Sequence, residues 1–157
     1  MRKFLFLIFA VPASLFSQLK IDQGGDGWKE QTEKALDLIA KTDSSKFSMI
    51  QKNCDHISFW LGDFSSNHIT PEGERIILIS VGDMKLASTE NLCGVLIHES
   101  IHLWIINNKV HVDPLSEELL CYNVELDFMK KLGGVDPWIL QHIENQITYY
   151  KNKKLQK

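Results

Sequence analysis

The sequence predicts an α+β fold in which a small antiparallel sheet packs on one buried helix, with further helices around it. Two stretches rich in β-forming residues, 56–61 and 75–81, each end at a Gly-Asp pair and predict strands. The run Leu92–Ile106 is apolar around its whole circumference, which is typical of a helix in a domain interior. Strands followed by a run of helices favour an α+β arrangement.

The elements before and between the strands follow from local signals. Residues 18–27 are rich in glycine and predict a turn-rich entry segment. Residues 28–40 place apolar side chains among charges and predict an amphipathic helix. Residues 42–45 then supply a stop and a new N-cap for a short helix that ends near Asn53. The polar stretch Ser65–Glu74 between the strands predicts a loop or hairpin tip.

Three helices are expected after the strands. Capping residues at 88–90 predict a helix over about Glu90–Asn107. Asp113-Pro114 starts a helix that closes at Gly133-Gly134, and Asp136-Pro137 starts a last helix through Tyr150. The tail 151–157 is polar.

The N-terminus predicts export. Arg2 and Lys3 precede a short apolar run and small residues, which is typical of a secretory signal peptide with cleavage after Ser17. We therefore expect a signal peptide over 1–17 and a secreted or periplasmic product consisting of a single domain, 18–157. No later apolar run reaches the 18 residues that a membrane span requires.

The net charge of the chain disfavours two classes of partner. The signal peptide contains two of the 17 basic residues, so the mature chain has 15 against 20 acidic residues, a net charge of −5. Such a surface disfavours nucleic acid and anionic lipid as partners. We expect a monomer.

Three cysteines, Cys54, Cys93 and Cys121, follow the signal peptide. Export permits one disulfide among them and leaves one thiol over, with no pairing readable from the spacing. A role as small buried hydrophobic residues is an equal expectation. No Cys-x-x-Cys pair is present to predict a cysteine zinc site.

The apolar helix contains His98-Glu99-Ser100-Ile101-His102. Residues four apart share a helix face, so both imidazoles can reach one metal ion. Glu99 lies about 100° around the helix, where it can touch a metal-held water without being a ligand. Burying two histidines and a glutamate unpaired would be costly, and a bound dication satisfies them.

A catalytic zinc takes three protein ligands and leaves one position for water. The metzincin spacing is absent, because Ile105 and Asn108 occupy the positions where that class has glycine and histidine. His111 lies past the expected helix end and cannot continue its ligand face. Glu117 and Glu118, on the next helix, are the better candidates. The alternative for either glutamate is a solvated first-turn carboxylate that favours the helix dipole.

Residues 75–133, with a strand, the His-Glu-x-x-His helix and a helix carrying Glu118, resemble a small, minimal zincin metallopeptidase of the gluzincin type. That resemblance implies a zincin-like fold with Zn²⁺ held by His98, His102 and Glu118. It also implies hydrolysis of peptide bonds, with Glu99 as general base. Strand 76–80 would be the edge strand that borders the cleft and pairs with an extended peptide or protein substrate.

Other side chains have expected supporting roles. Tyr122 shares a helix face with Glu118 and is expected at the site, and Glu125 is a candidate acceptor for a ligand imidazole. The oxyanion donor is left open among four side chains: Tyr122, His111, Tyr149 and His142. Little chain remains to form the far wall of a cleft, which predicts an open or shallow site.

Two alternatives to a peptidase remain. The metal could only stabilise a small non-catalytic domain, with Glu99 in a structural role. The chain could also be a binding module on a degenerate protease scaffold. The intact motif, including Glu99, favours the enzyme.

Overall fold

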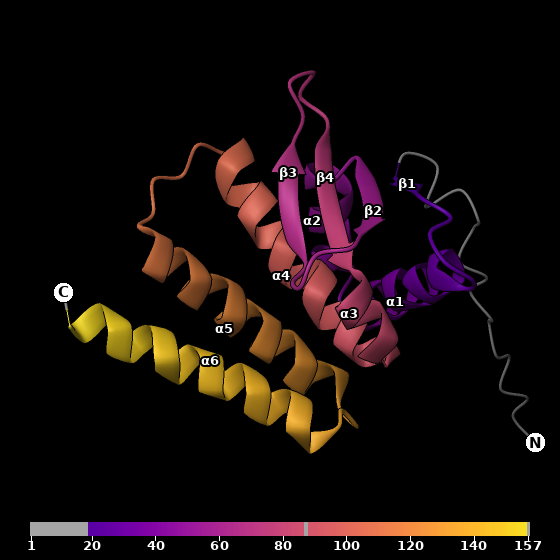
Figure 1. The fold of residues 1–157 in the computed structure, drawn as a ribbon. Helices are drawn as coiled ribbons and strands as arrows, with labels where there is room; N and C mark the ends of the chain where they lie inside the picture. The colour runs from indigo at the N-terminus through magenta and orange to yellow at the C-terminus, as the bar shows by residue number, and fades with distance from the viewer. Residues whose placement is uncertain (1–18, 87, 157) are drawn as a thin grey trace, which may run out of the picture.

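Four strands and six helices form an α+β structure in a computed structural model that describes residues 19–86 and 88–156 (Figure 1). The expected signal peptide lies outside the described residues. The elements, in order, are β1 Lys20–Ile21, α1 Trp28–Thr42, α2 Ser44–Asn53, β2 His56–Trp60, β3 Ser66–Ile69, β4 Arg75–Ser80, α3 Val81–Leu86, α4 Thr89–Asn107, α5 Pro114–Leu132 and α6 Pro137–Leu155.

The sheet is mixed, so the antiparallel prediction is wrong. Its strand order is β1-β2-β4-β3, with β1, β2 and β4 parallel and only β3 antiparallel to its neighbour β4. Ile77 of β4 pairs with Ile57 on one side and Asn67 on the other. The chain leaves β2, forms β3 on the outside, and returns through β4 into the middle of the sheet. The expected edge strand 76–80 is therefore interior, and β3 is the edge.

β3 lies inside the segment expected to be a loop. Only residues 70–74 of this segment form a hairpin tip. There the Thr70 N–H donates to the Glu74 carbonyl oxygen, and Gly73 has a φ of 90°. The strand itself is short, polar and half-exposed, as edge strands often are, and so lacks a hydrophobic alternation. The two-residue strand β1 was also not predicted.

The predicted helix starts are confirmed. Asp43, Ser88, Asp113 and Asp136 each cap the following helix by accepting backbone N–H groups with their side chains. Gly133 ends α5 with a positive φ of 69°, as expected. The last helix runs to Leu155 instead of ending at Tyr150, and α3 was not predicted.

The buried helix α4 is the centre of the packing. It contacts α1 and α2 on one side, β3 and β4 on another, and α5 on a third, while α6 packs against α5 (Figure 1). Its residues Leu92, Leu96 and Leu103 are fully buried. Burial against neighbours on three sides explains why most of α4 is apolar, whereas Trp104 and Ile106 near its C-terminal end remain partly exposed. Among the described helices, none has the length and apolarity that crossing a bilayer demands.

The cysteines form no disulfide in the structure. Cys54, Cys93 and Cys121 are free and buried. The Cys93 thiol donates to the Ala35 carbonyl oxygen at 3.3 Å, and burial raises the pKa of Cys93 to about 12. These thiols behave as the small buried residues that were the alternative to a bridge.

Candidate metal centre

Two histidines of α4 face one another across one helical turn. The Nε2 atoms of His98 and His102 are 3.3 Å apart, and their ring centroids are 5.1 Å apart. His98 is only 8% exposed. The four-residue spacing brings both rings to the same face of the helix, as the motif predicted.

A separate carboxylate holds the outer nitrogen of each ring. His98 Nδ1 lies 3.1 Å from Glu125 Oε2, and His102 Nδ1 lies 2.6 Å from Glu117 Oε1. An imidazole that donates its Nδ1 proton to a carboxylate presents a lone pair at Nε2. Both Nε2 atoms therefore face the space between the rings.

The carboxylate of Glu118 spans the two inner nitrogens. Its Oε2 is 3.6 Å from His98 Nε2, and its Oε1 is 3.6 Å from His102 Nε2. The hydrogen bond with His98 lowers the pKa of Glu118. Burial lowers the pKa of His98, but its contacts with Glu118 and Glu125 outweigh burial and raise it to about 10. The carboxylates around the two imidazoles therefore favour a positive charge between them.

A buried group of His98, His102 and Cys121 could hold a metal ion, because one ligand atom from each lies within 4.8 Å of the others. Cys121 comes from α5, three residues after Glu118 and therefore on a neighbouring part of the same helix face. Burial, and then the nearby Glu118 and Glu117, raise the pKa of its thiol. Sequence reasoning considered this cysteine only for a disulfide or for packing, although its helical spacing from Glu118 was readable.

Glu99 also reaches the site and has a partner that the sequence did not indicate. Its side chain is 7% exposed, and its Oε2 accepts a hydrogen bond of 2.9 Å from Asn67 Nδ2. Asn67 lies on the edge strand β3, inside the stretch expected to be a loop. Asn67 reaches Glu99 because of the register in which β3 pairs with β4, and the sequence pattern did not reveal that register.

Tyr122 lies against the His98 ring, as expected. Its ring meets His98 edge-on, with 4.4 Å between centroids and 66° between planes, and stacks on Tyr150 of α6 at 5.8 Å. Burial, and then Glu125, raise the pKa of its hydroxyl. The hydroxyl therefore keeps its proton at neutral pH and can donate a hydrogen bond. The ring therefore fixes one side of His98 and links the site to α6.

Two adjoining cavities open beside these residues, with volumes of about 560 and 170 Å³. β3 and the turn before it form one wall, and α6 forms the other with His142, Gln146 and Tyr150, which are four residues apart. The sequence appeared to leave too little chain for a far wall, but α6 folds back along α5 and supplies one. His142 lines both cavities, whereas Tyr149 and His111 line neither.

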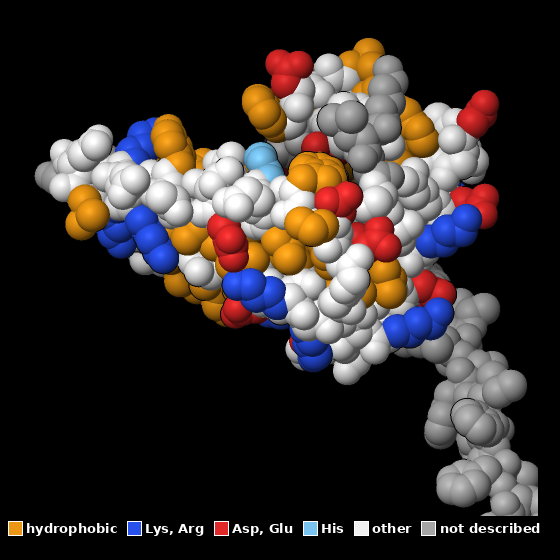
Figure 2. Space-filling model, turned by 90° about the horizontal axis from the view of Figure 1, so that it is seen from below, with side chains coloured by type: hydrophobic (Ala, Val, Ile, Leu, Met, Phe, Trp, Pro, Cys, Tyr) orange, Lys and Arg blue, Asp and Glu red, His pale blue; other side chains and the backbone are white. Residues whose placement is uncertain are grey.

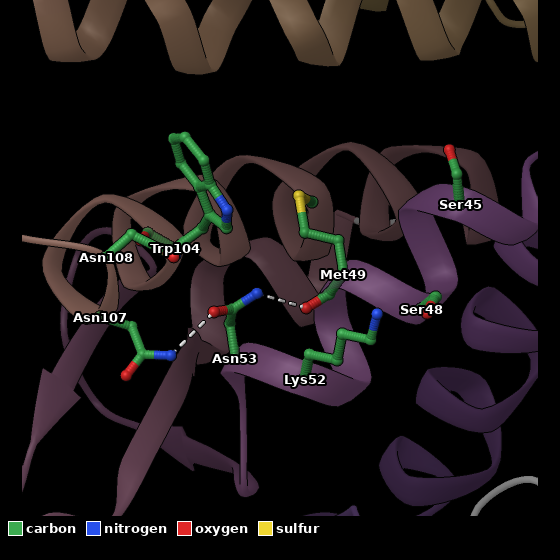
Figure 3. Close-up of a pocket in the computed structure, with 8 residues that line it drawn as sticks. All are labelled: Ser45, Ser48, Met49, Lys52, Asn53, Trp104, Asn107 and Asn108. Atoms are coloured by element: carbon green, nitrogen blue, oxygen red, sulfur yellow. Dashed lines mark hydrogen bonds between the residues drawn. The ribbon is translucent and has the colours of Figure 1, made fainter. Parts of the chain in front are cut away.

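A further hollow of about 500 Å³ lies between α2 and the C-terminal end of α4 (Figure 3). Asn107 Nδ2 donates to Asn53 Oδ1, and Asn53 Nδ2 donates to the Met49 carbonyl oxygen. These bonds join the ends of two helices, which accounts for the amides there. No histidine or carboxylate is among the eight residues labelled in Figure 3, so this hollow lacks the donors seen at the histidine pair.

No protein-family model, curated protein or solved structure matches this chain.

Proposed function

We propose that the protein is an exported, zinc-dependent metallopeptidase of minimal zincin type, with His98, His102 and Glu118 as metal ligands and Glu99 as general base. The observation that carries the proposal is the convergence of both Nε2 atoms and the Glu118 carboxylate on one point, with each Nδ1 held by its own glutamate. Outer carboxylates that orient ligand histidines are the usual support of zinc sites. Export rests on the N-terminal sequence pattern.

The spacing of the donors fits zinc. Two ligands about 2.05 Å from a tetrahedral zinc are roughly 3.3 Å apart. The two Nε2 atoms are separated by 3.3 Å, and each lies 3.6 Å from one Glu118 oxygen. Two imidazole nitrogens at this distance repel unless a proton or a metal cation lies between them. The donor set of nitrogen and carboxylate oxygen is also one that zinc accepts.

Glu118 is a better third ligand than Cys121 or Glu117. Its two oxygens face the inner nitrogens, whereas Glu117 contacts the outer Nδ1 of His102. The Cys121 thiol is fully buried beside carboxylates that oppose its ionisation, and a thiol must ionise to ligate zinc. These contacts favour Glu118 in the ligand role and Glu117 in the orienting role.

Bound zinc would lower the pKa of a water molecule and polarise the carbonyl of a peptide bond. Glu99 takes the proton of the attacking water and returns it to the leaving nitrogen. Because Asn67 occupies Glu99 Oε2, the other carboxylate oxygen is left to act on the water. Tyr122 orients His98 through its ring, and Tyr122 or His142 donates to the developing oxyanion.

The substrate of the proposed enzyme is an extended peptide. Among the strands that the structure describes, β3 is at the edge of the sheet and pairs with β4 alone, so its other side can accept a peptide strand. Ser66 and Asn67 of β3 line the larger cavity next to Glu99. A chain bound along β3 would therefore run between the edge strand and α6.

The test is hydrolysis of a quenched-fluorescent peptide mixture by the wild-type protein and by Glu99→Gln, with metal analysis of both. We expect one zinc per chain in each, and a loss of turnover of roughly 10² to 10⁴-fold in the variant. Glu90→Gln, at the first turn of the same helix and outside both cavities, is the matched control. Turnover that survives Glu99→Gln contradicts the assignment. Zinc without any wild-type turnover favours a structural metal, and absence of metal favours a binding module.

A further inference from the structure

The turn between β2 and β3 exposes three large apolar side chains beside the cleft. Trp60 is 41% exposed, Leu61 93% and Phe64 79%. Single exposed apolar residues are ordinary on protein surfaces, but three within five residues form a patch of the kind that marks a binding surface.

The turn is held in place by its own contacts. Trp60 Nε1 donates to the Phe64 carbonyl oxygen at 3.1 Å, and a Cβ at Gly62 would clash with the Trp60 ring, so the indole lies directly against the glycine. The next residue, Ser65, donates from its backbone N–H to Asp83 Oδ2 at 3.1 Å, and its hydroxyl oxygen accepts from Ser80 N at 3.0 Å. Phe64 therefore lies between two anchored points, and presenting its ring costs little conformational entropy on binding.

Phe64 faces the proposed reaction centre. It lines both cavities, and so do Glu99, Tyr122 and His142. Figure 2, the view from below, shows a histidine in a notch beside the arm that ends in the C-terminus of α6, with hydrophobic side chains next to it. The apolar turn is thus continuous with the cleft instead of forming a separate surface.

The charges of the cleft restrict what can lie against this turn. Among the described residues that line the two cavities, Asp83, Glu99, Glu118 and Glu125 are acidic, and none is Lys or Arg. A carboxylate on a bound peptide would meet like charge there and find no lysine or arginine to pair with. The cleft consequently favours a neutral, internal segment of a chain over an acidic segment or a free C-terminus.

We propose that the Trp60–Phe64 turn is the specificity element of the cleft, and that it selects peptides with a large apolar side chain next to the bond presented to Glu99. This inference rests on the proposed function for the identity of that bond. The apolar side chain would pack on the Phe64 ring at the start of β3, with Leu61 extending the contact away from the cleft.

The test uses two otherwise identical internal peptides, blocked at both ends, with Leu or Ser beside the scissile bond. For wild-type protein we expect kcat/KM to favour the Leu peptide by roughly 10 to 100-fold. Phe64→Ser should remove most of this preference while leaving the Ser peptide within about threefold and the zinc content unchanged. Leu155→Ser is the matched control, because Leu155 is an equally exposed apolar residue at the far end of α6.

A binding measurement separates failure of this inference from failure of the proposed function. Fluorescence anisotropy with zinc-loaded Glu99→Gln protein measures affinity for both peptides without turnover. We expect the Leu peptide to bind about tenfold or more tightly, and this advantage to disappear when Phe64→Ser is added. Equal binding of the two peptides, or an advantage that Phe64→Ser does not change, overturns the inference whether or not the wild-type protein hydrolyses peptides.

Discussion

Asn67→Ala is the sharpest test of how the edge strand serves the proposed reaction. Asn67 makes a hydrogen bond of 2.9 Å to Oε2 of Glu99, whose side chain is buried while Asn67 is half-buried. A hydrogen bond to a charged group contributes about 1.5–3 kcal/mol. If this bond orients the general base in the transition state, its loss lowers kcat by roughly 10 to 150-fold, because each 1.36 kcal/mol is about one factor of ten.

The measurement is steady-state hydrolysis of the best peptide at neutral pH. We expect the loss in kcat, with KM changed by less than about threefold, because Asn67 acts on the base and not on the substrate. Asn67→Asp should be slower still, since a second carboxylate would face Glu99. His68→Ala is the matched control, because His68 is the next residue on β3 and its side chain is exposed. Asn67→Ala with wild-type kcat refutes the positioning role.

Three further predictions follow from the same contacts. Glu118→Gln should weaken zinc binding more than Glu117→Gln, because Glu117 contacts only the outer nitrogen of His102 and an amide there would still accept a weaker hydrogen bond. We expect Glu117→Gln to cost about 10 to 100-fold in affinity, measured by competition with a chelating dye. Cys121→Ser should have the smallest effect, and the reverse order would make Cys121 the ligand. The metal-free protein should lose stability as pH rises from about 6.5 to about 10, by at most about 1.4 kcal/mol per pH unit in melting experiments. The raised pKa of His98 contributes its full stabilisation at pH values below the pKa that His98 has in the unfolded chain. It contributes none at pH values above the pKa that His98 has in the folded protein. His98→Gln should therefore flatten this pH dependence. Arg75→Ala should lower the free energy of unfolding by about 1 kcal/mol at pH 7, because the guanidinium contacts both oxygens of half-exposed Asp55. The difference should vanish as pH falls toward 2, the lowered pKa of Asp55, and a constant difference would contradict the role of this pair.

The helices could be predicted because their signals are local. Asp113 caps α5 and Gly133 ends it, and both roles depend on residues within one turn. The buried character of α4 was also readable, since a helix that is apolar on every face has no other stable place.

The sheet could not be predicted because its order depends on distant pairing. The two strongest strand signals correctly gave β2 and β4, but adjacency in the sequence did not reveal that they are parallel. A polar strand, β3, lies between them in the chain and outside them in the sheet. This edge strand pairs on one side, is four residues long and buries none of its side chains completely, so its sequence resembles that of a loop.

The candidate site also contains some residues that the sequence reveals and others that it does not. The residues of one helix, His98, Glu99 and His102, were readable from spacing. Which nitrogens Glu117 and Glu118 contact depends on how α5 is rotated against α4, since adjacent residues differ by about 100° around a helix, and the sequence does not show that rotation. Asn67 and the α6 wall reach the site only through packing between elements far apart in the chain.

The arrangement of carboxylates explains why the fold and the proposed metal depend on one another. Four glutamates lie around the two imidazoles, and two of them, Glu99 and Glu125, are almost completely buried. Buried carboxylates repel one another and remain ionised only with a positive partner. Protonated histidine can supply one such charge, whereas a dication between the two Nε2 atoms supplies two and also relieves the facing lone pairs. Since His98 and His102 lie on α4 while Glu117, Glu118 and Glu125 lie on α5, that cation would hold together the two helices that form the floor of the cleft.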